Sequence, residues 1–363
     1  MNPIKKTLFK RQITMSEIGE LGQQKLQDTA VLVVGCGGLG SPVAVQLAAS
    51  GIGTVHLVDY DTVDLTNLHR QVFYSIADKG RLKAQTLASF IQKRAPFTEV
   101  TFETVPVTKQ NVFRLISDVD VVVDATDSLP TKYLLNDACV IKNKPLIYGS
   151  LYKFDGYVAS FHVKQSDGTY SANLRDVFPE MRTDIPNCEE AGTLNAIVSF
   201  IAAQQVNEVL KLILGIGKPL TNQLLVYNSL QNSQLKIKLT PENLSESKRQ
   251  EKTLEIFDNE TYFDVTCELQ DMGLLISSEE FKAELTRENV EVISVIENLI
   301  APFKLDRTFS MHNENLDLCQ IDSSKKTVIV CQKGLTSYKA VKVLKKRFPK
   351  AVILSLAGGV NDY

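Results

Sequence analysis

Residues 31–61, VLVVGCGGLGSPVAVQLAASGIGTVHLVDYD, contain the pattern that decides the fold of this chain. Val31 to Val34 form an uninterrupted apolar run, which is typical of a strand buried on both faces of a parallel sheet. Glycines follow with the spacing G-x-G-x-x-G, which predicts a tight turn into a helix. We therefore expect a strand, a glycine loop, a helix and a second strand, the start of a Rossmann-like α/β sheet.

The glycine loop predicts a nucleotide-binding site. Gly35 allows the tight turn, Gly37 lets backbone N–H groups approach a phosphate, and Gly40 lets the helix pack closely on its strand. Gly38 belongs to the same loop, and the N-terminus of the following helix directs a positive partial charge toward an anion. Asp59 lies about twenty residues beyond the loop, where an acidic side chain typically binds a ribose hydroxyl.

Charged residues after the second strand favour ATP over a dinucleotide. The glycines alone also fit a Rossmann dehydrogenase, so this alternative stays open at that point. Asp61 comes next, and the following segment supplies Asn67, Arg70, Gln71 and Lys83. Several cationic side chains suit a triphosphate that is attacked and cleaved, whereas a dinucleotide site neutralises its pyrophosphate mainly with backbone amides.

Composition limits the class of protein. The 363 residues are enough for two domains, and 42 acidic residues against 40 basic ones argue against direct nucleic-acid binding. The six cysteines are scattered without close pairs, which indicates a reducing compartment. The N-terminal sequence lacks the apolar core of a signal peptide, and no uninterrupted apolar segment is long enough to span a bilayer. We therefore expect a cytoplasmic protein that does not cross a membrane.

Several motifs resemble, in order and spacing, those of the MoeB/ThiF family, the bacterial relatives of ubiquitin-activating enzymes. They are GCGGLGSPVA, LVDYDTVDLTNLHRQ, the lysine of KGRLKAQ, VVVDATDS and PNCEEAGTL. The resemblance covers residues 9–239 and implies a doubly wound α/β sheet that uses ATP and Mg²⁺. Asp127 matches the family aspartate that holds Mg²⁺, and a carboxylate oxygen suits that ion. The alternative role for Asp127 is a cap on the helix that begins near Pro130.

The chain departs from the family pattern near Asp127 and at a zinc site. Ser128 stands where the family usually has Asn, and Lys132 where it has Arg. Many members carry two C-x-x-C pairs that form a zinc site, but the corresponding segments here, YSANLRDVF and LTPENLSES, contain no cysteine. A structural zinc needs about four N or S ligands, and the four histidines are not suitably paired. We therefore predict no bound zinc.

Two further residues match family positions with catalytic roles. In the family, the arginine of an R-Q dipeptide reaches into the partner subunit's ATP site. Arg11 is the matching residue, which implies a homodimer, and the alternative is a solvated surface arginine. Cys188 matches a cysteine that, in the sulfur-transferring branch, joins covalently to the partner or to a sulfur intermediate. Adenylation-only members keep this cysteine without needing it, and Glu189 and Glu190 disfavour a thiolate there, so an inert cysteine is the alternative.

Composition also divides the chain into domains. The segment 240–255 is polar and charged, with almost no apolar residues, so we expect an exposed linker there. It would join an ATP-binding adenylation domain at 1–239 to a small α/β domain at 256–363. The apolar helix expected at 194–214 is interrupted by polar side chains that would each cost free energy in hydrocarbon, so a buried helix or a dimer face is the better interpretation.

The C-terminal domain contains a candidate reactive cysteine. A strand at 327–330 ends in Cys331, and the helix that begins near Ser337 directs N–H groups that favour a thiolate or persulfide. Lys333 would add a positive charge. The loop resembles the C-x-x-G-x-x-S active loop of rhodanese domains, and LAGGV near the end of the chain is also typical of them. The preceding segment matches poorly, so a non-catalytic rhodanese-like domain is the alternative.

Together, the resemblances imply an adenylyltransferase with sulfurtransferase activity. ATP would adenylate the C-terminal Gly-Gly carboxylate of a ubiquitin-like sulfur carrier protein of the MoaD/ThiS type. Arg11, Arg70 and Lys83 would spread the charge of the transition state. Sulfur from a persulfide on Cys331, loaded by a donor such as a cysteine desulfurase, would then produce a thiocarboxylate, with Cys188 taking the acyl group or resolving a disulfide.

Two alternative functions fit the same motifs. One is adenylation of another carboxylate, on a peptide or a tRNA, with the C-terminal domain reduced to a docking module. The other is a nucleotide-sensing scaffold in which Cys331 senses oxidants. The motifs do not distinguish among molybdenum-cofactor, thiamin, cysteine and tRNA-thiolation pathways.

Overall fold

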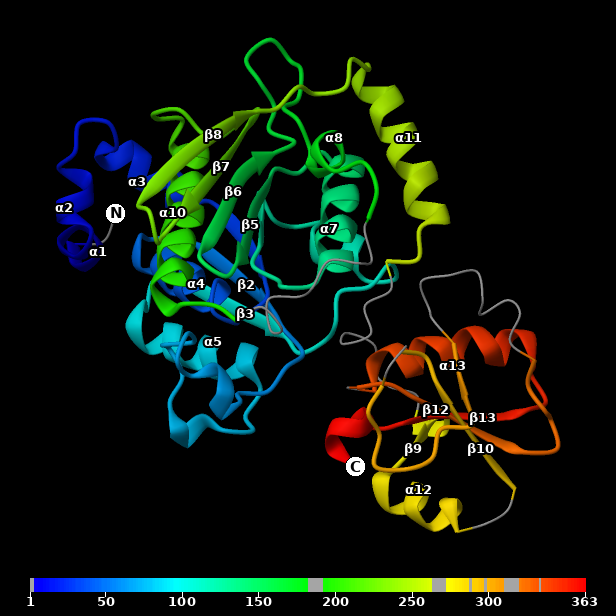
Figure 1. The fold of residues 1–363 in the computed structure, drawn as a ribbon. Helices are drawn as coiled ribbons and strands as arrows, with labels where there is room; N and C mark the ends of the chain where they lie inside the picture. Colours follow the sequence, from blue (N-terminus) through cyan, green and yellow to red (C-terminus); the bar gives the residue numbers. More distant parts are fainter. Residues whose placement is uncertain are drawn as a thin grey trace. The chain divides into compact units, whose positions relative to one another are not determined.

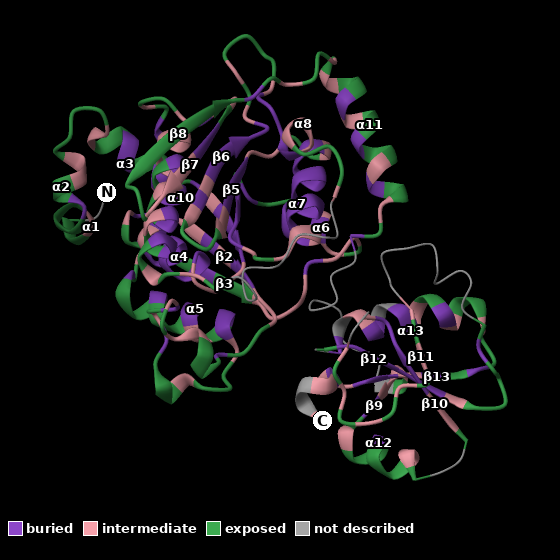
Figure 2. Cartoon of the chain, in the orientation of Figure 1, coloured by how far each residue is buried: buried purple, intermediate pink, exposed green. Residues whose placement is uncertain are grey.

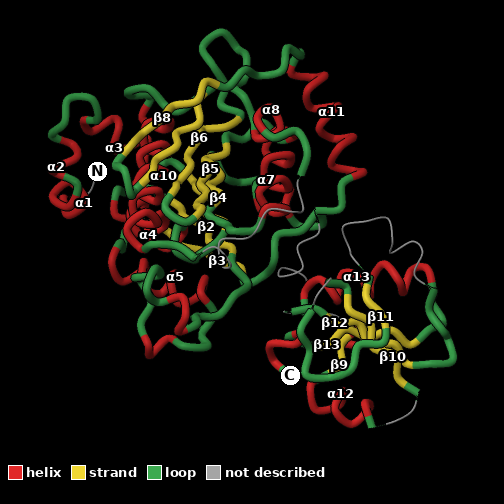
Figure 3. The backbone as a smooth tube through the Cα atoms, in the orientation of Figure 1, coloured by secondary structure: helices red, strands yellow, loops and turns green. Residues whose placement is uncertain are grey.

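The computed structural model divides the chain into two compact units, Met1–Tyr262 and Phe263–Tyr363 (Figure 1). It describes residues 3–181, 192–262, 272–286, 289–296, 299–309, 320–332 and 334–363. Each unit has its own central sheet covered by helices, as the tube drawing shows (Figure 3).

The first unit is built on an eight-stranded sheet in the order β3-β2-β1-β4-β5-β6-β7-β8. Five strands run parallel: β3 (Glu99–Glu103), β2 (Thr54–Val58), β1 (Ala30–Val34), β4 (Val121–Asp124) and β5 (Leu146–Tyr152). Three more continue the sheet antiparallel: β6 (Asp155–Phe161), β7 (Gln223–Asn228) and β8 (Ser233–Lys238). This mixed sheet confirms the predicted Rossmann-like α/β class.

Helices cover both faces of this sheet, which explains the continuous apolar run in β1. Val31 and Val33 face one core with α3 (Gly19–Gln27), α4 (Gly40–Ala49), α5 (Lys83–Arg94) and α10 (Asn195–Leu214). Leu32 and Val34 face the other core with α6 (Val112–Leu115), α7 (Leu129–Ile141), α8 (Leu174–Val177) and α11 (Glu246–Asn259). Buried residues accordingly follow the strands and the inner sides of these helices (Figure 2). The short helices α1 (Pro3–Leu8) and α2 (Lys10–Ile13) precede α3.

α10 is a core helix of the first unit. By length and composition it passes the test for a membrane-spanning helix, but half of its apolar window, 50%, is buried inside the protein. It packs against α4, β5 and β6. This agrees with the expectation of a buried helix at 194–214.

The structure corrects the expectation of an exposed linker at 240–255. Residues Glu246–Asn259 form α11, which packs against α7. Its buried residues, Arg249, Thr253 and Phe257, are spaced by four and so form one stripe along the helix. Because most of the helix surface is polar, composition alone made the segment resemble a linker. The first compact unit consequently extends to Tyr262.

The second unit has a five-stranded sheet in the order β11-β10-β12-β13-β9, with every pairing parallel. The strands are β9 (Leu275–Ile276), β10 (Val290–Ser294), β11 (Arg307–Thr308), β12 (Lys326–Val330) and β13 (Val352–Leu356), and the helices are α12 (Ser278–Leu285) and α13 (Leu335–Arg347). β12 lies centrally and its last three residues are fully buried. This is the small α/β arrangement that the sequence predicted, with β12 ending directly before Cys331.

Candidate active site

The predicted nucleotide-binding residues of the first unit lie around the point where the strand order of its sheet reverses. β1 lies between β2 and β4, so the segments that leave the carboxyl ends of β1 and β4 diverge and open a crevice, the usual ligand site of such sheets. Hydrogen bonds join these strand ends: Gly35 N–H donates to the Val58 carbonyl at 2.8 Å, and Ala125 N–H to the Val34 carbonyl at 2.9 Å. The glycine loop and residues 125–127 therefore face the same crevice.

Two glycines of the loop leave no space for a side chain. Gly35 has a φ of +89°, and a Cβ there would lie 2.7 Å from the Ala125 carbonyl oxygen. A Cβ at Gly40 would lie 1.7 Å from the Gly35 carbonyl oxygen. The loop therefore packs closely on β4 and α4, and the backbone N–H groups at the N-terminus of a helix such as α4 suit a phosphate.

Asp59 is held beside the glycine loop by backbone donors. Its carboxylate accepts hydrogen bonds from the N–H groups of Cys36 at 2.6 Å and Asp61 at 2.8 Å. Burial raises the pKa of Asp59 to about 6, although Lys83 and the two backbone donors oppose the shift. At neutral pH the group is therefore mostly a carboxylate in a defined orientation, as a ribose-binding acceptor requires.

Lys83 is a buried cation surrounded by carboxylates. It begins α5, is 5% exposed, and its Nζ lies 2.8 Å from Asp61 Oδ2. Burial by itself would lower the pKa of Lys83, but the carboxylates of Asp59, Asp61 and Asp127 outweigh it and raise the pKa. The lysine therefore stays charged and connects the acidic residues after β2 with the acidic residue after β4.

A turn places Arg70 and Gln71 against the glycine loop. The Asn67 carbonyl, at the end of η1 (Leu65–Asn67), accepts hydrogen bonds from the N–H groups of Arg70 at 3.1 Å and Gln71 at 3.0 Å. Arg70 Cγ would lie 3.5 Å from a Cβ at Gly38, and Gln71 Nε2 would lie 3.3 Å from one at Gly37. Gln71 Oε1 is buried and has no hydrogen-bond partner among the described residues. Asn67 thus contributes to the site through its backbone.

Asp127 is exposed and does not cap α7. The helix begins at Leu129 and its N-cap is Ser128, whose Oγ accepts a hydrogen bond from Thr131 N–H at 3.2 Å. An exposed carboxylate that interacts electrostatically with Lys83 fits Mg²⁺, which takes one or two carboxylates together with phosphate and water oxygens in nucleotide sites. Within the described ranges, no group of three or more His, Cys, Asp or Glu side chains is placed to hold a metal by itself.

Tyr74 supports the site, and the motifs did not single it out. Its hydroxyl donates to the Cys36 carbonyl at 2.7 Å and lies 3.3 Å from the Lys83 carbonyl oxygen. It therefore joins the glycine loop to the start of α5. A tyrosine three residues after Gln71 is a weak signal in the sequence, because buried tyrosines are common in cores.

The chain does not bring its own Arg11 to the glycine loop. Arg11 is exposed on α2, and its neighbour Gln12 donates to the Gln23 side chain at 2.8 Å and to the Ser50 carbonyl at 2.9 Å. Ser50 is the C-cap of α4, a helix of 10 residues and hence about 15 Å long. Because the glycine loop lies at the other end of α4, α2 is fixed about one helix length away from it.

Cys331 is buried at the N-terminus of α13. It is 1% exposed, and Ser337 N–H donates to its Sγ at 3.3 Å. Ser337 Oγ also lies 3.3 Å from Sγ and 2.8 Å from Ser355 Oγ. Gly334, the N-cap, adopts a φ of +79°. The helix N–H expected to stabilise the sulfur is present, whereas Cys188 and Lys333 lie outside the described residues.

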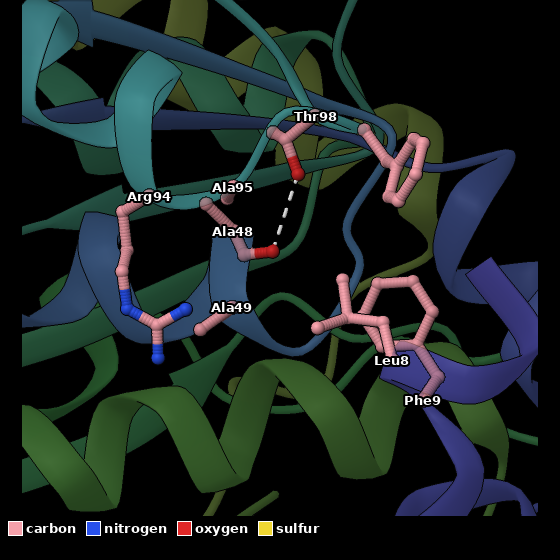
Figure 4. A pocket seen from close by; sticks show the side chains of 8 residues that line it. Leu8, Phe9, Ala48, Ala49, Arg94, Ala95 and Thr98 are labelled. Carbon is pink, nitrogen blue, oxygen red and sulfur yellow. Dashed lines mark hydrogen bonds between the residues drawn. The ribbon is translucent and has the colours of Figure 1, made fainter. Parts of the chain in front are cut away.

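A small pocket elsewhere in the first unit contains none of the predicted site residues (Figure 4). It is lined by Leu8, Phe9, Ala48, Ala49, Arg94, Ala95, Phe97 and Thr98. The lining is mostly apolar and comes from the end of α1, the far ends of α4 and α5, and the segment that follows α5. This pocket is therefore not the candidate active site, which is defined by the strand ends and charged groups that converge on the glycine loop.

Comparisons with known proteins identify the family. The ThiF family matches residues 9–248. The sulfur carrier protein adenylyltransferase of Thermus thermophilus is 40% identical over 62% of this chain and 84% of that protein. The probable adenylyltransferase/sulfurtransferase MoeZ of Mycobacterium tuberculosis is 39% identical over 62% of this chain, and the match spans 58% of that protein. The adenylyltransferase and sulfurtransferase MOCS3 of Drosophila grimshawi is 31% identical over 98% of this chain and 83% of that protein.

Solved structures share the fold. PaaA superposes with a TM-score of 0.56 and 22% identity over 66% of this chain and 75% of that one. Escherichia coli MccB with ATP superposes with a TM-score of 0.54 and 23% identity over 61% of this chain and 67% of that one. The glycine loop, the cluster of charged groups at the strand ends and these matches agree, and the chain is a member of the ThiF family.

Proposed function

We propose that this chain adenylates the C-terminal Gly-Gly carboxylate of a small sulfur carrier protein and then transfers sulfur to it from Cys331. The observation that carries the first step is the buried Lys83 cation, with the carboxylates of Asp59, Asp61 and Asp127 around it, at the mouth of the glycine loop. The names of the relatives that act on sulfur carriers or transfer sulfur support the same reaction.

Each group of the site has a role in the first step. Loop N–H groups bind phosphate oxygens, and Asp59 accepts a hydrogen bond from the ribose. Asp127 would hold Mg²⁺, which supplies positive charge to the phosphates. The carrier carboxylate attacks the α-phosphorus of ATP, the bond to the bridging oxygen breaks, and pyrophosphate leaves with the electron pair. Arg70 and Lys83 stabilise the charge that develops on the phosphate oxygens.

A second copy of the chain would complete this site. α2 is anchored about one helix length from its own glycine loop, so Arg11 would act at a partner's ATP. In such a homodimer, Arg11 of one copy would reach the ATP site of the other. This would explain why Arg11 is exposed although Gln12 holds its helix in place.

Sulfur transfer would use the second unit as a rhodanese-like domain. A desulfurase would load Cys331 with a persulfide, and its terminal sulfur would attack the acyl adenylate, releasing AMP and forming an acyl disulfide. The Cys188 thiol would then attack Cys331 Sγ, releasing the thiocarboxylate and leaving a Cys188–Cys331 disulfide. A thiol reductant would restore both cysteines. The N–H of Ser337 would stabilise the Cys331 thiolate before it accepts sulfur and again after the reductant releases it.

The test separates the two stages. Exchange of labelled pyrophosphate into ATP is measured with Mg²⁺, with and without candidate carriers that end in Gly-Gly. Exchange that requires one carrier supports adenylation and identifies the partner. Absence of exchange with every carrier contradicts the proposal and favours adenylation of a peptide or tRNA carboxylate.

The sulfur step is tested with the Cys331→Ser variant. Replacement of the carrier's terminal oxygen by sulfur is followed by mass spectrometry with a persulfide donor present. The variant is expected to retain carrier-dependent exchange and lose thiocarboxylate formation. Thiocarboxylate formed at the wild-type rate would remove Cys331 from the mechanism.

A further inference from the structure

A buried ion pair lies behind the turn that presents Asp127. Asp124 is the last residue of β4 and Lys132 lies in the first turns of α7. Lys132 Nζ is 3.0 Å from Asp124 Oδ2, and the two side chains are 4% and 0% exposed. Two charges are retained in the interior only when their partners are well placed, because desolvation is costly. The ion pair therefore holds the end of β4 against the start of α7.

The same carboxylate shapes the turn itself. Asp124 Oδ1 accepts hydrogen bonds from Thr126 N–H at 3.1 Å and Thr126 Oγ1 at 2.8 Å. Ser128 then caps α7. Asp127 lies between these two fixed residues, is exposed, and interacts electrostatically with Lys83. Its direction is set by hydrogen bonds that belong to its neighbours.

Contacts from two other elements lock the ion pair. Lys132 Nζ also donates to the Gly149 carbonyl on β5 at 2.7 Å, and Gln205 Nε2 on α10 donates to the Asp124 carbonyl at 2.8 Å. A Cβ at Gly149 would lie 2.4 Å from the Gln205 side chain, so this layer is closely packed. A shift of the Lys132 side chain would consequently also shift the residues at the end of β4.

We propose that Lys132 and Asp124 are positioning residues for adenylation, which hold Asp127 in the orientation that binds the Mg²⁺ accompanying ATP. This inference rests on the proposed function, because Asp127 is a metal ligand only when nucleotide binds here. Because both side chains of the pair are buried, neither is placed to touch a nucleotide in the crevice. Groups that orient a metal ligand typically change metal affinity or activity about 10–100-fold when removed.

The experiment measures nucleotide binding by calorimetry in the full-length chain, with Mg²⁺ and with a chelator. Lys132→Met removes the charge and keeps the length of the side chain. We expect unchanged ATP affinity in the chelator and about a 10–100-fold higher Mg²⁺ concentration for half-maximal tightening. Lys132→Arg, which retains the charge, is expected to restore wild-type Mg²⁺ dependence. Lys142→Met is the matched control on the exposed, C-terminal end of α7 and should bind like the wild type.

The outcomes distinguish this inference from the proposed function. A wild-type chain that binds no ATP contradicts the proposed function. If the wild type shows Mg²⁺-dependent binding and folded Lys132→Met shows the same dependence, the positioning role is wrong. Should Lys132→Met fail to fold, Thr126→Val removes only the hydroxyl contact to Asp124, and the role then requires a shifted Mg²⁺ dependence in that variant.

Discussion

Asp176→Ala is expected to loosen α11 from the first unit. The Asp176 carboxylate, with its side chain 5% exposed, accepts a hydrogen bond from Arg249 Nη1 at 3.0 Å and from Glu242 N–H at 3.0 Å. Asn173 donates to it through its backbone N–H and through Nδ2, both at 2.9 Å. Arg249 also donates to the Glu242 carbonyl at 2.8 Å. One carboxylate therefore joins the two segments in which many family members have cysteine pairs.

The magnitude follows from the burial of the pair. Removing one partner leaves the Arg249 guanidinium, 7% exposed, without its carboxylate, and breaking a buried pair in this way costs about 3–5 kcal/mol. Lys252→Met is the matched control, because Lys252 lies on the same helix and pairs with Glu242, which precedes the helix, while the two side chains are 52% and 47% exposed. An exposed pair contributes about 0.2–1 kcal/mol.

Hydrogen exchange of the α11 amides compares the free-energy cost of Asp176→Ala with that of Lys252→Met locally. It does not require the assumption that both units unfold together. Asp176→Ala should lower protection by more than about 100-fold, since about 1.4 kcal/mol corresponds to tenfold. The double variant Asp176→Ala/Arg249→Met should recover part of the loss, because it removes the unpaired charge. Equal effects of Asp176→Ala and Lys252→Met would refute this account of how α11 is held.

Further predictions concern the site and the pH dependence of stability. Lys83→Met should lower pyrophosphate exchange by about two to three orders of magnitude, whereas the exposed Lys79→Met should leave it unchanged. Gly40→Ala should abolish ATP binding measured by calorimetry, because its Cβ would lie 1.7 Å from the Gly35 carbonyl oxygen. Burial, with a smaller effect of Arg249, lowers the pKa of His162 from 6.5 to about 3. His162 therefore takes up a proton in the unfolded chain as pH falls below about 6.5, while it stays neutral in the folded chain. The free energy of unfolding of the first unit, measured by chemical denaturation, should consequently fall by about 2 kcal/mol by pH 5, and His162→Gln should remove this loss.

Local signals in the sequence predicted the elements around the nucleotide site well. The apolar run of β1 and the glycines of the loop determine the backbone conformation locally. Their pattern therefore predicted β1 at Ala30–Val34 and the start of α4. Spacing along the chain likewise indicated Asp59 and Lys83, which the structure brings together. Tyr74 was missed because its contact with Cys36 crosses 38 residues of sequence and leaves no short motif.

By itself, the sequence determined the strand, loop, helix and strand of residues 30–58 and the charged groups that follow, because glycine conformation and apolar periodicity act over a few residues. Only the tertiary structure decided which polar residues are buried. It turned a segment that resembled a linker into α11, gave the cap of α7 to Ser128 so that Asp127 faces solvent, and placed Lys132 against Asp124. These outcomes depend on partners from other strands and helices, because burying a charged or polar side chain costs free energy unless such a partner is present.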